Sequence, residues 1–462
     1  MNPLVQLTDT HAHLDGAGYD ADRAAVITRA TAAGVTHILT VGCDLKSSQA
    51  AVELAKSTPH IYAAVGIHPH DAATANAETR AALQQLIVSS DKVVAVGEMG
   101  LDYYRDRAPR AIQHNCFRHQ IALAKEVNLP LIVHDRDAHD DVLTILREED
   151  AAAVGGVLHC FSGDIAMAHA CIELGFYISF PATITYPNND ALRAVARSIS
   201  TDHLLIETDC PYLSPQKFRG KRNEPAYLRY TAEKLAEIKG LSLADISRIT
   251  SLNAYRLFGI GDIDQSARIA YAIRDSLYLN ITNRCTNSCT FCAKFKDWTV
   301  KGHQLKLERE PSVAEVRAAI GDPSRFREVV FCGYGEPLLR IDLVKEIAAW
   351  LKEQGCKVRV NTDGQANLVH QRNILPELHG LIDTVSVSLN AADAATYQHW
   401  CRSRFGEQGY VAVKEFLTLA KAHIPEVIAT AVALPGLDMA ACRAAADETG
   451  VKFRAREYNE LG

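Results

Sequence analysis

Histidines and carboxylates stand at the ends of short apolar runs in the first half of the chain. His11 and His13 form an H-x-H pair directly after the run at 4–9. Alternate residues of a strand point to the same side, so this pair would direct two imidazoles toward one point. Later runs end in the same residue types, at Glu98, His134, His159 and Asp209. Four imidazoles and two carboxylates are too many ligands for one tetrahedral ion. They suit two divalent ions bridged by a carboxylate, with zinc, manganese or magnesium as candidates.

Three cysteines lie close together in the segment NRCTNSCTFCAKF (283–295), with the spacing C-x3-C-x2-C: Cys285, Cys289 and Cys292. Three thiolates would occupy three corners of a [4Fe–4S] cluster and leave one iron open to an amine and a carboxylate, such as those of S-adenosylmethionine (SAM). A structural zinc site is the alternative, but it would need a fourth ligand at a matching spacing, which the sequence lacks. The spacing therefore favours the cluster.

The elements that must position the first set of ligands follow a βα rhythm. Eight apolar runs alternate with helical stretches within about 260 residues, and they lie at 4–9, 36–41, 61–67, 93–98, 129–134, 155–159, 176–180 and 203–208. This predicts a TIM (β/α)8 barrel over residues 1–262. An open doubly wound sheet has the same rhythm. The placement of the ligands at strand ends favours the barrel, whose active sites lie at that face.

A second α/β domain is predicted after a boundary near 260–268. Six further apolar runs lie at 277–282, 328–333, 357–362, 383–389, 427–434 and 451–455. Helical stretches separate them, so residues 268–462 are expected to form a partial (β/α)6 barrel. The cysteine segment directly follows the first of these runs.

Composition limits the partners that we expect. The chain has 462 residues, of which 48% are hydrophobic, and a net charge of −6. A large nucleic-acid footprint would need a basic surface, so a nucleic-acid substrate would have to be held locally. We find neither a secretory signal pattern nor an apolar run long enough to span a membrane, and we expect a cytoplasmic protein without membrane contact.

The first domain resembles the TatD family of metal-dependent deoxyribonucleases. The resemblance rests on the stretches DTHAHLD (9–15), GIHPH (66–70), VGEMGLDYYRD (96–106), LPLIVHDRDAHDD (129–141), GVLHCFSG (156–163) and LLIETDCPYLSP (204–215). It implies two metal sites. His11, His13 and Asp209 would hold one ion, and His134 and His159 the other, with Glu98 between them. Asp209 and Glu98 would be the catalytic carboxylates, with Asp209 as general base.

A basic stretch after the eighth run could bind phosphates, through Lys217, Arg219, Lys221 and Arg222. A solvated surface loop is an equal alternative for such a run of charges. Tyr103 and Tyr104, beside Glu98, could stack on a base, although a tyrosine at a barrel rim more often only packs.

The second domain resembles the radical SAM superfamily, whose motif is C-x3-C-x-aromatic-C after the first strand. FCGYGEP (331–337) is similar to the superfamily's G-G-E-P motif. The resemblance implies that Gly333, Gly335 and Glu336 bind the amino group of SAM, although Tyr334 departs from the motif. Polar residues at later strand ends, namely Asn361, Ser388 and Asn390, could contact SAM or could merely cap loops.

Together the two halves resemble TatD-associated radical SAM proteins. We therefore expect a bifunctional enzyme. The barrel would be a 3′–5′ exonuclease acting on DNA or RNA phosphodiesters. The second domain would modify an unknown substrate with electrons from a donor such as flavodoxin or ferredoxin. The alternative is a metal-dependent deacylase or amidohydrolase acting on an ester or amide, with the radical SAM domain as a modifying partner or a cluster-bearing sensor.

Overall fold

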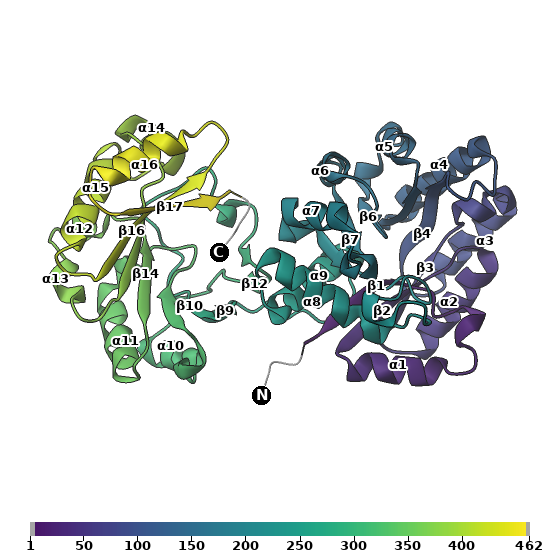
Figure 1. Cartoon of the computed structure of the whole chain (residues 1–462), viewed down its shortest axis with the longest axis horizontal. Coiled ribbons are helices and arrows are strands. Elements are labelled where there is room, and N and C mark those ends of the chain that lie inside the picture. Colours follow the sequence, from purple (N-terminus) through teal and green to yellow (C-terminus); the bar gives the residue numbers. More distant parts are fainter. Residues whose placement is uncertain (1–4, 459–462) are drawn as a thin grey trace. The chain divides into compact units, whose positions relative to one another are not determined.

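The computed structural model describes residues 5–458, and the chain divides into two compact units that adjoin in sequence at Asp264 and Gln265 (Figure 1). Each unit has a hydrophobic core of its own. Among the residues that are described, no helix is both long enough and apolar enough to cross a membrane.

The first unit is the predicted (β/α)8 barrel. Its strands are β1 (Leu7–Ala12), β2 (Val35–Val41), β3 (Ile61–Val65), β4 (Val93–Asp102), β5 (Leu131–Arg136), β6 (Gly156–Leu158), β7 (Phe176–Phe180) and β8 (Leu204–Ile206), all parallel and paired in chain order. Asp209 N donates to His11 O at 2.9 Å, and His13 N donates to Cys210 O at 2.8 Å. These bonds close the sheet between β8 and β1, which excludes the open sheet.

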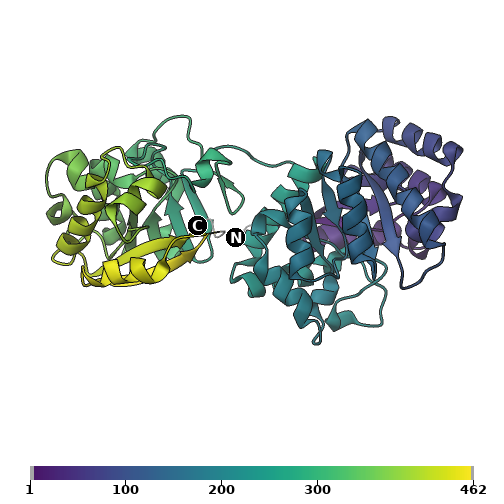
Figure 2. The same ribbon diagram turned by 90° about the horizontal axis from the view of Figure 1, so that it is seen from above.

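Helices follow the strands and cover the outside of the sheet (Figure 2). They are α1 (Arg23–Ala32), α2 (Leu45–Ser57), α3 (Ala77–Val88), α4 (Arg110–Val127), α5 (His139–Glu148), α6 (Ile165–Glu173), α7 (Asp190–Ser198), α8 (Leu228–Lys239) and α9 (Leu243–Phe258). Local sequence sets several of their ends. Ser242 accepts from Asp245 N at the start of α9, and Asp245 accepts from Ser242 N in return. Gly240 ends α8 with a φ of 59°, which glycine adopts at little cost.

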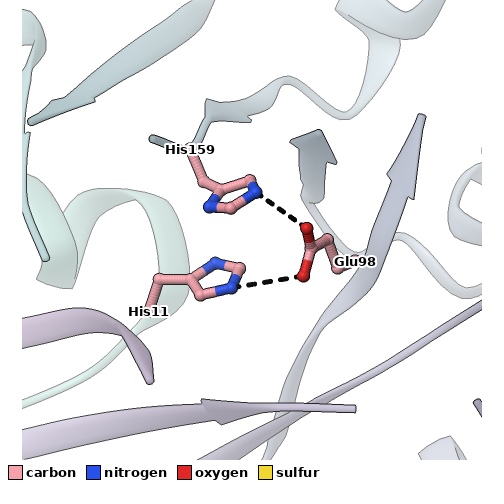
Figure 3. A group of neighbouring side chains, drawn as sticks. All are labelled: His11, Glu98 and His159. Carbon is pink, nitrogen blue, oxygen red and sulfur yellow. Dashed lines mark ion pairs between the residues drawn. The ribbon is translucent and has the colours of Figure 1, made fainter. Parts of the chain in front are cut away.

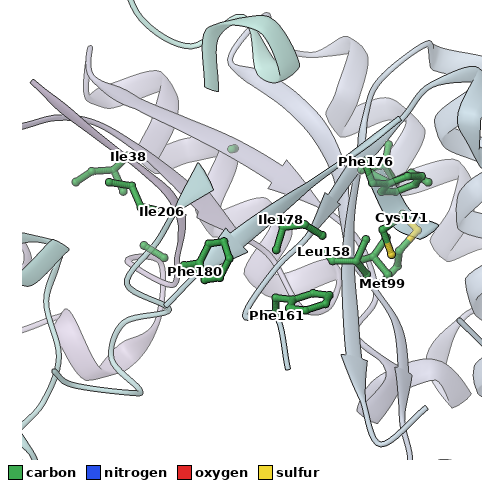
Figure 4. Close-up of a cluster of buried hydrophobic side chains, with 14 of the residues drawn as sticks. Ile38, Met99, Leu158, Phe161, Cys171, Phe176, Ile178, Phe180 and Ile206 are labelled. Carbon is green, nitrogen blue, oxygen red and sulfur yellow. The ribbon is translucent and has the colours of Figure 1, made fainter. Parts of the chain in front are cut away.

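Two apolar layers hold the barrel together. Strand residues such as Ile178 and Phe180 join helix residues such as Phe117 in a layer between sheet and helices, part of which Figure 4 shows. Alternate strand residues, including Ile132, form a second cluster that lines the barrel interior. Because side chains alternate along a strand, the residue two positions after Ile132 points to the same interior, at the carboxyl end of the strand.

The second unit is an open, mixed sheet in the order β17-β16-β15-β14-β13-β10-β9. The six predicted strands are parallel: β10 (Ser276–Leu279), β13 (Glu328–Phe331), β14 (Val358–Thr362), β15 (Thr384–Ser388), β16 (Glu426–Ala433) and β17 (Lys452–Glu457). A seventh strand, β9 (Ala270–Ile273), was not predicted. It pairs antiparallel with β10 through a turn at Arg274 and Asp275, in a segment that reads from sequence as a connector.

Helices again follow the strands of this unit (Figure 1). They are α10 (Val313–Ile320), α11 (Ile341–Glu353), α12 (Ala366–His370), α13 (Leu375–Leu378), α14 (Ala394–Cys401), α15 (Gln408–Ala420) and α16 (Met439–Asp447), and a short ribbon of β11 (Thr299–Val300) and β12 (His303–Gln304) follows the cysteine segment. Phe331, Tyr397 and Phe416 are fully buried in the core.

Candidate metal centre and cluster site

The six predicted ligands of the barrel lie together at the carboxyl ends of its strands. The Glu98 carboxylate faces His11 with one oxygen and His159 with the other (Figure 3). Its Oε1 lies 2.8 Å from both His134 Nδ1 and His159 Nε2, and its Oε2 lies 3.4 Å from His11 Nε2 and 3.8 Å from His13 Nε2. One carboxylate therefore faces two groups of imidazoles, one with each oxygen.

Asp209 completes the group around the H-x-H pair. Its Oδ1 lies 3.3 Å from His13 Nε2 and 3.9 Å from His11 Nε2. His11, His13 and Asp209 form a set with one donor atom each, all within 4.8 Å of one another, and so do His11, Glu98 and His159. His11 thus belongs to both sets, and the division into two ion sites is less sharp than the motif implies.

The strand alternation explains how distant residues meet. His134 follows the interior residue Ile132 by two positions on β5, and His159 follows Val157 by two positions at the end of β6. Each imidazole therefore points to the inside of the barrel, above the apolar layer. Glu98 lies within β4, whose ten residues are all buried.

The charges at this site fit divalent cations. Burial raises the pKa of Glu98, but the nearby His159 and His68 hold it well below its usual value, and burial lowers the pKa of His11. Two pairs of imidazole nitrogens face each other at 3.3 Å, one between His11 and His13 and one between His134 and His159. Imidazole nitrogens that face one another around an ionised carboxylate are a donor set that divalent cations would stabilise.

Two buried ring nitrogens without hydrogen-bond partners also indicate that this site fits divalent cations. His11 Nδ1 and His159 Nδ1 are buried without a hydrogen-bond partner among the described residues. A buried polar atom without a partner costs free energy, so such atoms concentrate at sites with another role. His159 Nδ1 has the Glu207 carboxylate at 3.6 Å, which is well placed to orient the ring.

Three residues near this centre were missed from the sequence. His68 follows β3, and its Nε2 lies 3.4 Å from Glu98 Oε1. Asp102 accepts from His70 Nε2 at 2.8 Å and lies 3.3 Å from His134 Nε2. The sequence held a signal for each of them. His68 and His70 lie in GIHPH, which follows the third apolar run, and Asp102 lies at the carboxyl end of β4.

The predicted phosphate-binding loop is partly engaged in local packing. Arg222 donates to Gly18 O and pairs with Asp22 at 2.6 Å. Lys217 Nζ lies 3.2 Å from the Tyr230 hydroxyl, and the Arg219 guanidinium lies 4.7 Å from the centre of the Tyr186 ring. The remaining cation of the loop, Lys221, is exposed.

Aromatic side chains at the mouth divide into packed and exposed ones. The Tyr103 hydroxyl bonds to Asp141 and His114, both at 2.5 Å, so this ring is part of the local packing. Tyr104 is 57% exposed. Tyr212, which the sequence did not single out, is 62% exposed, and its ring centre lies 6.1 Å from that of His13.

The three cysteines of the second unit lie in the segment after β10 and are half-buried. Burial raises the pKa of Cys285 and of Cys292, and the nearby Cys289 raises both further. Within the segment, Cys292 N donates to Cys289 O at 3.0 Å, and Asn287 N donates to Cys285 Sγ at 3.4 Å. Thr290 N donates to Trp400 O at 2.9 Å, which holds the segment against the end of α14.

A buried carboxylate lies beside this cysteine segment. Glu336 accepts from Leu338 N at 2.9 Å, from the Thr362 hydroxyl at 2.9 Å and from Asp363 N at 2.6 Å. Asp363 in turn has its Oδ2 at 3.9 Å from Cys285 Sγ. The structure thus brings Glu336 and the cluster motif together through Asp363, which the sequence did not single out.

The two glycines and two asparagines that were predicted to contact SAM are engaged in contacts within the protein. A side chain at Gly335 would overlap the carbonyl oxygen of Thr282, and one at Gly333 would overlap Asn280, so both glycines permit close packing of loops. Asn361 Oδ1 accepts from Arg359 at 3.0 Å, and Asn390 Oδ1 accepts from Val432 N at 3.2 Å. Ser388 lies half-buried at the end of β15.

Fold and site together define a class of protein: a metal-dependent hydrolase built on a (β/α)8 barrel, fused to an open α/β unit with a cysteine motif. The chain belongs to the family described as TatD related DNase, whose model matches residues 8–259. The model of the radical SAM superfamily matches residues 279–448, so the second unit is a radical SAM domain. The fusion predicted from the sequence is confirmed, and both halves mark the chain as an enzyme.

Similar proteins cover the barrel and support this assignment. An uncharacterized metal-dependent hydrolase, YabD of Bacillus subtilis, is 50% identical over 254 residues, which are 55% of this chain and 99% of that protein. The 3′-5′ ssDNA/RNA exonuclease TatD of Escherichia fergusonii is 37% identical over 54% of this chain and 98% of its own. The crystal structure of the TatD homolog YJJV from Escherichia coli has a TM-score of 0.54 and 32% identity, and it covers 56% of this chain and 100% of that one.

Membership in these two families implies cofactors in general terms. The hydrolase family implies divalent metal ions for the barrel, and the superfamily implies a [4Fe–4S] cluster and SAM for the second unit. The donor sets described above fit these groups: imidazoles and carboxylates suit divalent ions, and three thiols in one segment suit a cluster.

Proposed function

We propose that the barrel is a two-metal phosphodiesterase that removes nucleotides from the 3′ end of single-stranded DNA or RNA. The observation that carries this proposal is the Glu98 carboxylate, whose two oxygens face two separate groups of imidazoles. A relative at 37% identity is named a 3′-5′ ssDNA/RNA exonuclease, which supports the choice of substrate.

The residues of the chain have distinct roles in this reaction. Divalent ions held by the six ligands would supply an acidified water and positive charge beside the phosphate. Glu98 holds the two groups of imidazoles at a fixed separation. Asp209, whose pKa lies below its usual value because His13 and His11 outweigh the effect of its burial, is ionised at neutral pH and accepts a proton from the attacking water.

Hydrolysis of a labelled oligonucleotide tests this proposal. The full-length protein, loaded in turn with Mg²⁺, Mn²⁺ or Zn²⁺, is incubated with a single-stranded oligonucleotide that carries its label at the 5′ end. We expect a ladder that shortens one nucleotide at a time. An acyl ester and an amide are assayed in parallel. A metal-loaded protein that hydrolyses the ester or the amide and leaves the oligonucleotide intact would overturn the proposal in favour of a deacylase.

For the second unit we propose reductive cleavage of SAM. Cys285, Cys289 and Cys292 would hold the cluster, and the Glu336 carboxylate, next to them through Asp363, would bind the amino group of SAM. When bound, a cluster would supply the electron for cleavage of SAM. The protein's part would be to present the buried Glu336 carboxyl group, whose pKa is raised by burial and by the nearby Asp363, to the amino group of SAM.

Anaerobic reconstitution tests this second assignment. We expect about four irons and four sulfides per chain, and formation of 5′-deoxyadenosine when SAM and a reductant are added. The variant Cys289→Ala should lose both iron and product. A reduced cluster that leaves SAM intact would instead favour a sensor.

A further inference from the structure

One exposed cation at the mouth of the barrel belongs to none of the predicted sites. On β5, Ile132 lies in the barrel interior and His134 faces Glu98. Arg136 is the next residue of the same alternation and ends the strand. Side chains two residues apart on a strand point to the same side. Arg136 therefore lies beyond the metal centre on the same line of side chains, and it is exposed.

The Arg136 guanidinium rests on an aromatic ring. Its central carbon lies 4.2 Å from the centre of the Tyr104 ring, which is 57% exposed, and the Arg105 guanidinium lies 5.4 Å from the same ring. The backbone supports this arrangement, because Tyr103 N donates to Arg136 O at 2.9 Å. A cation held over an aromatic face is ordered without losing its hydrogen-bond donors.

The charge of Arg136 is free for a ligand. Within residues 5–458 it forms no ion pair, whereas Arg222 of the predicted phosphate loop is paired with Asp22 at 2.6 Å. A planar guanidinium binds a phosphate with two parallel hydrogen bonds and offers its face to a base. An exposed tyrosine likewise offers a stacking surface that accepts any base.

We propose that Arg136 and Tyr104 form a nucleotide subsite next to the metal centre. Arg136 binds a phosphate that neighbours the scissile one, and the exposed Tyr104 ring with its stacked guanidinium carries an adjoining base of single-stranded nucleic acid. This inference rests on the proposed phosphodiesterase function and extends it. It also explains how a chain with a net charge of −6 holds a polyanion locally.

Binding of an oligonucleotide to the full-length protein tests the subsite. The probe is a fluorescein-labelled single strand of twelve thymidylates, followed by fluorescence anisotropy in EDTA at several salt concentrations, so that no hydrolysis occurs. We expect Arg136→Ala to raise Kd about 10-fold and to reduce the slope of log K against log salt by about 0.7, the value for one phosphate contact on a single strand. Tyr104→Leu should raise Kd at least about 5-fold with an unchanged slope.

A matched control variant separates phosphate binding by Arg136 from the general effect of removing one positive charge from the protein. Arg147 is an exposed arginine in the last turn of α5, which begins after β5 at the mouth and runs to the opposite end of the barrel. Arg147→Ala should leave Kd and slope as in the wild type. Equal effects of the two substitutions, or a wild type that does not bind the probe, would overturn the inference.

A small substrate separates the subsite from the reaction itself. The phosphodiester bis(p-nitrophenyl) phosphate has no neighbouring phosphate, so Arg136→Ala should retain its kcat/KM within about 2-fold. An equal loss on this substrate and on the oligonucleotide would place Arg136 in the metal centre and overturn the subsite. A wild type that binds the oligonucleotide through Arg136 but never cleaves it would refute the proposed hydrolysis and leave the subsite standing.

Discussion

At the residue scale, the candidate metal centre of the barrel depends on one carboxylate, that of Glu98. Glu98 is 2% exposed, and five imidazoles surround it, those of His11, His13, His68, His134 and His159. Its charge would otherwise be costly to bury. The sequence could predict Glu98 because it follows an apolar run and lies in a recognisable motif. It could not show which side chains each oxygen faces, since that depends on the closure of the barrel.

Replacing the Glu98 carboxylate by an amide of the same shape should strongly lower the hydrolase activity of the barrel. We expect Glu98→Gln to lower kcat/KM for bis(p-nitrophenyl) phosphate at least about 100-fold, because an amide holds two cations less well than a carboxylate. Glu233→Gln on α8, an exposed residue paired with Arg229, serves as the control and should behave as the wild type. An active Glu98→Gln enzyme would show that the carboxylate does not join the two groups of imidazoles.

Asp102 should act through His134. It lies 3.3 Å from His134 Nε2, while His134 Nδ1 faces Glu98, so the carboxylate fixes the orientation of the ring. We expect Asp102→Asn to weaken metal binding about 10- to 100-fold, as is typical for partners of ligating histidines. Titration of the metal-free protein measures this, and Asp106→Asn, in the exposed turn after β4, is the control. Unchanged affinity would mean that His134 needs no such support.

At the scale of elements, the strands were more predictable than the connections. All eight barrel strands and five of the six parallel strands of the second unit follow from buried apolar runs, because parallel strands covered on both faces have such sequences. The sixth, β17, was also predicted, although it lies at the edge of the sheet and is mostly exposed. β9 has only four residues, at the edge of the sheet, and its alternation is too short to identify it. His68 and Asp363 lie in loops, where the strand pattern gives no direction for a side chain.

The helix that closes the barrel offers a test of local structure. Ser242 caps α9 by accepting from Asp245 N at 3.1 Å, and α9 carries Ala254 and Phe258 into the interior cluster. We expect Ser242→Ala to lower the free energy of unfolding of the first unit by about 1 kcal/mol. Denaturation followed by circular dichroism measures the change. Ser89→Ala, whose hydroxyl only donates to Leu86 O at an exposed helix end, should change it by less than about 0.5 kcal/mol.

At the scale of the whole molecule, the chain joins two separate cores. The cores of residues 5–264 and 265–458 share no residue. All three tryptophans, Trp298, Trp350 and Trp400, lie in the second unit. Tryptophan fluorescence therefore reports on the radical SAM domain alone, whereas circular dichroism reports on both units.

Metal removal should act on one unit only. A ligand that binds the folded state at about 1,000 times its Kd stabilises that state by about 4 kcal/mol, so chelation should lower the Tm of the barrel by roughly 10 °C. The transition seen by tryptophan fluorescence in the cluster-free protein should not move. A parallel shift of both transitions would show that the two units unfold together.

The metal content of the barrel tests the central claim most directly. The full-length protein, without a cluster, is saturated with Mn²⁺, which imidazoles and carboxylates bind in preference to thiols, freed of excess metal by gel filtration and measured by mass spectrometry of the elements. The shared Glu98 carboxylate predicts two equivalents per chain for the wild type and at most one for Glu98→Gln. A wild type that retains no metal, or a variant that still retains two equivalents, would contradict a centre joined by this carboxylate.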